Sequence, residues 1–187
     1  MSYVIYEKPS YDYLKSVTVE ISGSAEKNAI SEADSNFYTE NKEANTLEWM
    51  GTGVIIAKSN DYMYILTNAH VAGKGLDNPI LKINEGKRYY SVKIIKYHEE
   101  LDMALIRISS QLEDKRAIKG LGIAKEQDAI YLVGHHLGRT YTYGEGVMAG
   151  WDGNNLIVQI PILFGNSGSG VFNKHGYLIG LIWSVSV

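Results

Sequence analysis

The chain has 187 residues, of which 45% are hydrophobic and 21% charged, and this balance excludes a disordered or fibrous protein. Its 18 basic and 21 acidic side chains give a net charge of −3 at pH 7 without a long basic run, so we expect no nucleic-acid partner. The most apolar stretches cover about ten residues, roughly half of what a bilayer crossing needs, so we expect no membrane partner.

The sequence contains no cysteine, which excludes disulfides, thiolate nucleophiles and thiolate metal sites. This composition fits a reducing and an oxidising compartment equally well. Residues 1–6 lack the basic start, apolar segment and small-residue cleavage site of a secretory signal. The location is therefore undetermined, and the missing signal favours the cytoplasm.

Short runs rich in Val, Ile, Leu and Tyr follow one another along the chain and predict β-strands separated by turns. Helical periodicity is weak, and the sequence predicts one short helix over residues 11–14 with Pro9 in its first turn. The regular alternation of short predicted strands and turns favours an all-β sandwich or barrel. The predicted strands cover residues 16–21, 52–57, 62–66, 80–83, 89–95, 103–108, 130–133, 146–149, 156–160, 170–172 and 178–183.

Two polar segments interrupt these strands. Residues 22–48 carry six acids and two lysines, a composition that predicts a long acidic surface loop, with a partner-docking or activation role as the alternative. Residues 111–120 carry five charged side chains and indicate a connection between two strand-rich halves. We therefore expect one β lobe over residues 1–112, a connection over 113–120 and a second β lobe over 121–187.

A serine enclosed by glycines follows the strand that is predicted near residue 160. In the segment 165–170, Gly165 and Gly168 stand two residues before and one residue after Ser167. Glycine permits backbone angles that aim successive N–H groups into one cavity beside the serine oxygen, as an oxyanion hole requires. The same composition also forms ordinary hairpin turns, so residues elsewhere must decide between the two interpretations.

A nucleophilic serine needs a base, usually a histidine whose tautomer is set by a carboxylate. His70 ends an apolar strand where a loop begins, so its ring would be held rigidly and still reach a cleft. Asp102 is a lone acid at the start of another apolar strand and needs a partner for its charge. Taken alone, each residue fits a structural role better than a functional one, but together with Ser167 they supply a nucleophile, a base and an orienting carboxylate, and the functional interpretation is favoured.

Three blocks in the chain resemble the signature blocks of trypsin-like serine proteases in their order and spacing. They are Thr-Asn-Ala-His-Val at residues 67–71, Asp-Met-Ala-Leu-Ile at 102–106 and Gly-Asn-Ser-Gly-Ser at 165–169. The resemblance is closest to HtrA/Deg-type and glutamyl-endopeptidase-like proteases and extends over residues 51–183. It implies an all-β fold of two antiparallel six-stranded barrels packed at a cleft. Only 20 residues follow Ser167, fewer than in most members of the family, so we expect the second barrel to be incomplete.

The resemblance also implies a serine endopeptidase that hydrolyses peptide bonds through an acyl-enzyme and needs no cofactor. Ser167 would be the nucleophile, His70 the general acid and base, and Asp102 the orienting carboxylate. The backbone N–H groups of Gly165 and Ser167, on the loop that contains Asn166, would form the oxyanion hole.

The chain departs from glutamyl endopeptidases at Ile182, where those proteins carry a histidine. We expect an apolar pocket that accepts a small or medium apolar side chain before the cut, and the alternative is that these side chains only fill the second lobe. The candidate substrate-binding residues are Ile162, Leu163, Ile182, Trp183 and Ser184.

The expected partners are protein or peptide substrates, and a regulatory partner or self-association is left open. His135 and His136 are expected at the rim of the cleft, and no Asp/Glu-His spacing suits a zinc site. The alternative function is a catalytically inactive binding module that keeps the protease fold.

Overall fold

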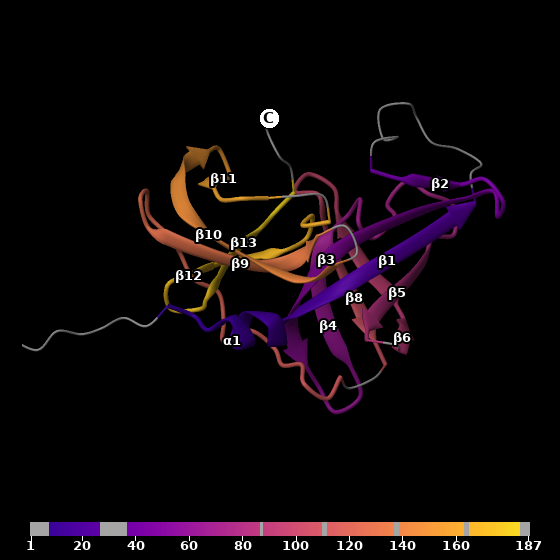
Figure 1. Ribbon diagram of the computed structural model, residues 1–187, viewed down its shortest axis with the longest axis horizontal. Helices are drawn as coiled ribbons and strands as arrows, with labels where there is room; N and C mark the ends of the chain where they lie inside the picture. Colours follow the sequence, from indigo (N-terminus) through magenta and orange to yellow (C-terminus); the bar gives the residue numbers. More distant parts are fainter. Residues whose placement is uncertain are drawn as a thin grey trace, which may run out of the picture.

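The computed structural model describes residues 8–26, 37–86, 88–109, 112–136, 139–162 and 165–183. Within them, one short helix accompanies two curled antiparallel sheets, which occupy opposite sides of the molecule in Figure 1. The predicted all-β class with two lobes is confirmed.

The helix α1 (Tyr11–Ser16) begins after Ser10, whose side chain accepts a hydrogen bond from the Tyr13 N–H at 3.1 Å. Pro9 therefore precedes the N-cap instead of occupying the first helical turn. Leu14 and Val17 are fully buried at the end of α1 that faces the second sheet. Within the described residues no helix is long and apolar enough to cross a bilayer.

The first sheet contains eight strands in the order β6-β5-β1-β3-β4-β8-β7, with β2 paired to β3. Alternate side chains of each strand point inward, so that Ile65 of β4 and Ile106 of β8 are fully buried in one core. The strands are β1 (Thr18–Glu26), β2 (Thr39–Asn41), β3 (Thr46–Lys58), β4 (Met63–Asn68), β5 (Ile80–Glu85), β6 (Arg88–Ser91), β7 (Lys93–His98) and β8 (Met103–Ile108).

The second sheet contains five strands in the order β11-β10-β9-β12-β13. Val54 of the first sheet packs with Val133 and Phe172 of the second sheet, and Leu14 of α1 and Val17, the C-cap of that helix, belong to the same cluster. The two lobes therefore share an apolar interface. The strands are β9 (Ala129–His136), β10 (Arg139–Asp152), β11 (Asn155–Gln159), β12 (Gly170–Asn173) and β13 (Leu178–Leu181).

The polar segment 22–48 is not a loop throughout, because it contributes to β1, β2 and β3. Ala25 of β1 pairs with Leu47 of β3, and both are buried. Serine, glycine and alanine on β1 hide the strand pattern, since the large apolar side chains that cover this strand come from β3. Residues 27–36 of the expected loop lie outside the described residues.

Candidate active site

His70 and Asp102 meet at the ends of two neighbouring strands. The last residue of β4, Asn68, pairs with the first residue of β8, Met103, so the residues just beyond these ends come together. His70 Nδ1 lies 2.6 Å from Asp102 Oδ2, and the His70 backbone N–H donates to Asp102 Oδ1 at 3.1 Å. The carboxylate thus holds both the ring and the backbone of His70, and Nε2 is the ring nitrogen left for other chemistry.

The backbone of Asp102 is itself fixed in an uncommon conformation. Its φ is 45°, a left-handed value that costs energy for residues other than glycine. Its carbonyl oxygen accepts from the Ala69 N–H at 3.0 Å and from Asn68 Nδ2 at 3.2 Å, and its own N–H donates to the Glu99 oxygen at 3.2 Å. These contacts hold the Asp102 side chain toward the imidazole.

The loop that carries Ser167 turns sharply at two glycines. Gly165 has a φ of 97° and Gly168 a φ of 84°, values that L side chains rarely adopt. A Cβ on Gly168 would also lie 2.0 Å from the Thr52 carbonyl oxygen. In the described part of the chain no hydrogen bond is donated by the N–H groups of Gly165 and Ser167, and the side chain of Asn166 is buried.

Thr52 of β3 fastens this loop to the other lobe. Its N–H donates to the Ser167 carbonyl at 2.8 Å, and its hydroxyl donates to the Gly165 carbonyl at 2.9 Å. The same hydroxyl accepts from the His135 backbone N–H at 3.1 Å. Thr52 is fully buried, and sequence reasoning missed it, although a hydroxyl inside an otherwise apolar strand was a usable signal.

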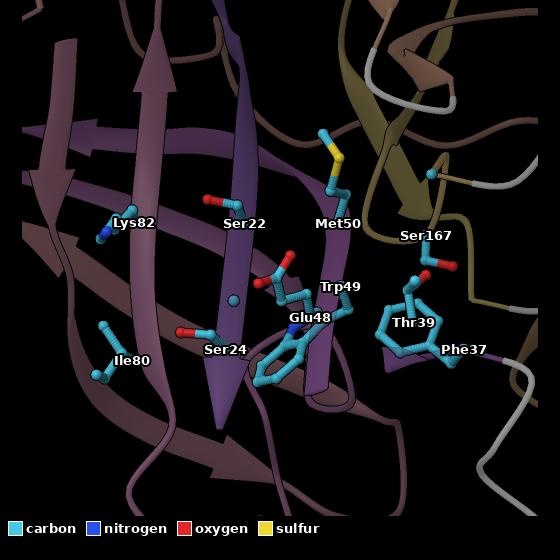
Figure 2. A pocket seen from close by; sticks show the side chains of 12 residues that line it. Ser22, Ser24, Phe37, Thr39, Glu48, Trp49, Met50, Ile80, Lys82 and Ser167 are labelled. Atoms are coloured by element: carbon cyan, nitrogen blue, oxygen red, sulfur yellow. The ribbon is translucent and has the colours of Figure 1, made fainter. Parts of the chain in front are cut away.

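Ser167 lies close to the strand end of His70. A Cβ on Gly51 would be 2.6 Å from Val71 Cγ1 and 3.2 Å from the Ser167 carbonyl oxygen, so the residue after His70 and the serine backbone converge there. The Phe37 ring packs edge-on against His70 with centroids 4.7 Å apart and shares with Ser167 the lining of a cavity of about 680 Å³ (Figure 2). Among the described residues no hydrogen bond joins the Ser167 hydroxyl to the imidazole, so the complete triad stays a prediction.

The candidate specificity residues lie on the second lobe. Ile182 is 5% exposed, and Ile162 packs against the same core, whereas Trp183 is 52% exposed. These three do not line the cavity that Ser167 shares with Phe37. Leu163 and Ser184 lie outside the described residues.

The expectation that His135 lies at the cleft rim is wrong, because its side chain is buried against the Tyr141 ring with centroids 4.3 Å apart. Burial, with a smaller contribution from the positive charge of Lys115, lowers the pKa of His135 to about 3. Glu20 Oε2 is 3.9 Å from Nε2, too far for a hydrogen bond. The described residues contain no group of three or more side chains suited to holding a metal ion.

We expect the buried His135 to make the protein less stable in mild acid. The folded state keeps this ring neutral down to about pH 3, while the unfolded chain binds a proton below about pH 6.5. Stability is therefore lost as the pH falls through this range, by about 2 kcal/mol at pH 5. Urea unfolding at pH 7.5 and pH 5 measures the loss.

The matched variant for this measurement is His135→Gln, which removes the titrating ring from the same site. Its free energy of unfolding should fall less between pH 7.5 and pH 5 than that of the unmodified protein, by about the same 2 kcal/mol. An equal fall in both proteins would show that other groups govern the acid sensitivity.

Comparison with known proteins identifies one family and a set of relatives. The family described as trypsin-like peptidase domain matches residues 51–181. Two curated relatives, both named serine protease HtrA-like and from Staphylococcus aureus strains bovine RF122 / ET3-1 and USA300, are 27% identical over 164 residues. Each match covers 75% of this chain but 21% of the relative, so the chain spans about a fifth of their length. The chain belongs to the trypsin-like peptidase domain family.

Proposed function

We propose that this chain is a serine endopeptidase with Ser167 as nucleophile, His70 as general acid and base, and Asp102 as orienting carboxylate. The observation that carries the proposal is the 2.6 Å contact between His70 Nδ1 and Asp102 Oδ2 at two adjoining strand ends. A carboxylate on Nδ1 fixes the tautomer in which Nε2 is the base, and it stabilises the imidazolium that forms when a proton is taken.

The reaction begins when Ser167 Oγ attacks the carbonyl carbon of the substrate while His70 Nε2 takes the hydroxyl proton. The carbonyl oxygen becomes an anion, for which the N–H groups of Gly165 and Ser167 are the donors. The C–N bond then breaks as His70 returns the proton to the leaving amine. Water, deprotonated by His70, hydrolyses the acyl-enzyme and regenerates the serine.

The Ser167 hydroxyl reaches His70 when a substrate occupies the cleft. Catalytic hydrogen bonds are often long in substrate-free enzymes and tighten only in the complex. A bound substrate also displaces water from the His70 ring, one side of which Phe37 already covers. Both effects favour the short Oγ to Nε2 contact that the first step requires.

The residue before the cut is proposed to be small or medium and apolar. The Ile182 backbone hydrogen-bonds the residues that follow the nucleophile, because its N–H donates to the Ser169 oxygen at 2.9 Å and its carbonyl accepts from the Gly168 N–H at 2.8 Å. This pairing holds Ile182 beside the residues that follow Ser167, and Ile162 packs against the same second-lobe core as Ile182, which supports an apolar subsite. A charged residue at the cut would find no partner from these side chains.

A fluorophosphonate probe tests the proposal, because it reacts only with an activated serine. We expect the unmodified protein and the Ser59→Ala control, which loses an exposed turn serine, to be labelled and to cleave peptides. Ser167→Ala should show no labelling, and its cleavage rate should fall by about 10⁴-fold or more. A protein that neither takes up the probe nor cleaves a diverse peptide pool at neutral pH is the inactive binding module instead.

A further inference from the structure

The cavity beside Ser167 continues as a groove over the outer face of the first sheet (Figure 2). Its floor is β1, where Ser22 and Ser24 present short side chains. The strands on either side carry longer ones, since Met50 of β3 and Lys82 of β5 both pair with Ser22. In the next row Ser24 pairs with Glu48 of β3 and with Ile80 of β5. Small residues between two rows of larger ones produce a channel along the strands.

The occupant of this groove follows from its position relative to Ser167. The residues proposed to receive the side chain before the cut, Ile162 and Ile182, belong to the second lobe, whereas the groove lies entirely on the first lobe apart from Gly165 and Ser167. A peptide cut at Ser167 therefore places its leaving half in the groove. An extended peptide suits a channel that runs along strands.

The spacing of residues along β3 indicates which residue of this peptide reaches Glu48. Thr52 touches the Ser167 backbone at 2.8 Å, and Glu48 stands four residues earlier on the same strand, about 13 Å away at 3.3 Å per residue. An extended peptide that runs beside β3 covers this length with three or four residues. Its third or fourth residue after the cut therefore reaches Glu48.

Glu48 is the charged group best placed to bind that residue. Its side chain is exposed, and Figure 2 shows the carboxylate directed into the groove near Ser22. Oε1 accepts a hydrogen bond from Asn41 Nδ2 at 3.0 Å, which orients the carboxylate, and within the described residues Oε2 has no partner. The other charge, Lys82, lies two strands away on β5, with Nζ 5.8 Å from the centre of the Tyr89 ring.

We propose that Glu48 selects substrates with a lysine or arginine at the third or fourth residue after the cut, an inference that rests on the proposed function. An exposed ion pair of this kind changes affinity by about two- to fivefold. The preference should weaken in high salt, because mobile ions screen exposed charges.

Cleavage of three matched peptides tests this preference. They carry Lys, Gln or Glu at the third and fourth positions after a cut site that peptide profiling has defined. We expect kcat/KM for the Lys peptide to exceed that for the Gln peptide by about two- to fivefold. Glu48→Gln should remove the difference and Glu48→Lys should reverse it in favour of Glu. Glu126→Gln, which removes the same charge from the second lobe, should leave it unchanged.

Binding of the same peptides to Ser167→Ala, measured by fluorescence anisotropy, separates this inference from the proposed function. If no peptide is cut but the Lys peptide binds more tightly in a manner that depends on Glu48, the groove assignment stands and the endopeptidase proposal fails. If Lys and Gln peptides are cut and bound equally, or the Lys preference survives in Glu48→Gln, the groove assignment is overturned. A preference for Glu in the unmodified protein would assign the selection to Lys82 and overturn it as well.

Discussion

Replacing Asp102 by asparagine should lower kcat by about 10³- to 10⁴-fold with little change in KM. Asparagine has nearly the same shape, but its amide hydrogens would face His70 Nδ1 in place of the carboxylate that now lies 2.6 Å away. The ring would then carry its proton on Nε2 and could not accept the serine proton. Steady-state cleavage of one defined peptide measures both constants.

The control for this variant is Glu99→Gln, which removes one negative charge close to the same strand end. Glu99 pairs with Lys74 at 3.5 Å, and its exposed carboxylate is not part of the proposed triad. We expect its kcat to stay within about twofold of the unmodified value. A folded Asp102→Asn protein with nearly normal kcat would remove Asp102 from the mechanism.

The second large effect on kcat is expected from substitution of Thr52, which positions the loop that carries Ser167 and takes no direct part in the proposed reaction. Thr52→Val keeps the shape of the side chain but removes the hydroxyl that bonds both the Gly165 carbonyl and the His135 N–H. The loop that carries Ser167 loses this anchor, and a shift of about 1 Å in a reacting group can lower kcat by about 10²-fold. Two buried polar groups also lose a partner, at about 1–3 kcal/mol each.

Thr52→Ser separates the two roles of this residue, because it retains the hydroxyl and removes only a methyl group. We expect it to recover most of the kcat and most of the rate of fluorophosphonate labelling that Thr52→Val loses. If both variants are equally impaired, the methyl packing matters and not the hydrogen bonds. Urea unfolding of each variant shows whether stability alone explains the loss.

Local patterns in the sequence predicted most of the strands and the pairing of two site residues. Apolar runs locate β4 and β8 because their side chains alternate between core and surface over six residues each. His70 and Asp102 could be assigned because each follows or precedes such a run directly. Polar residues at the ends of buried strands are informative, since the strands fix where they point.

Features that depend on distant partners could not be predicted in this way. The strand character of residues 22–26 comes from burial under Leu47 and Trp49 of another strand, and nothing within Ser-Gly-Ser-Ala reveals it. The burial of His135 could not be predicted either, because a histidine in an apolar run is equally compatible with the rim of a cleft and with the protein interior. The hydrogen bond from Thr52 to Gly165 spans 113 residues, beyond the reach of any local pattern.

The anchoring of Ser167 by Thr52 has a consequence for newly made protein. On the ribosome the residues that supply base and acid emerge well before the nucleophile, and domains generally fold as units during synthesis. The serine loop is fastened in part by docking onto β3 of the earlier half, through the N–H and the hydroxyl of Thr52. Under the proposed function, a nascent chain would therefore carry no competent nucleophile until both halves have met, which would protect its own unfolded segments and neighbouring chains from premature cleavage.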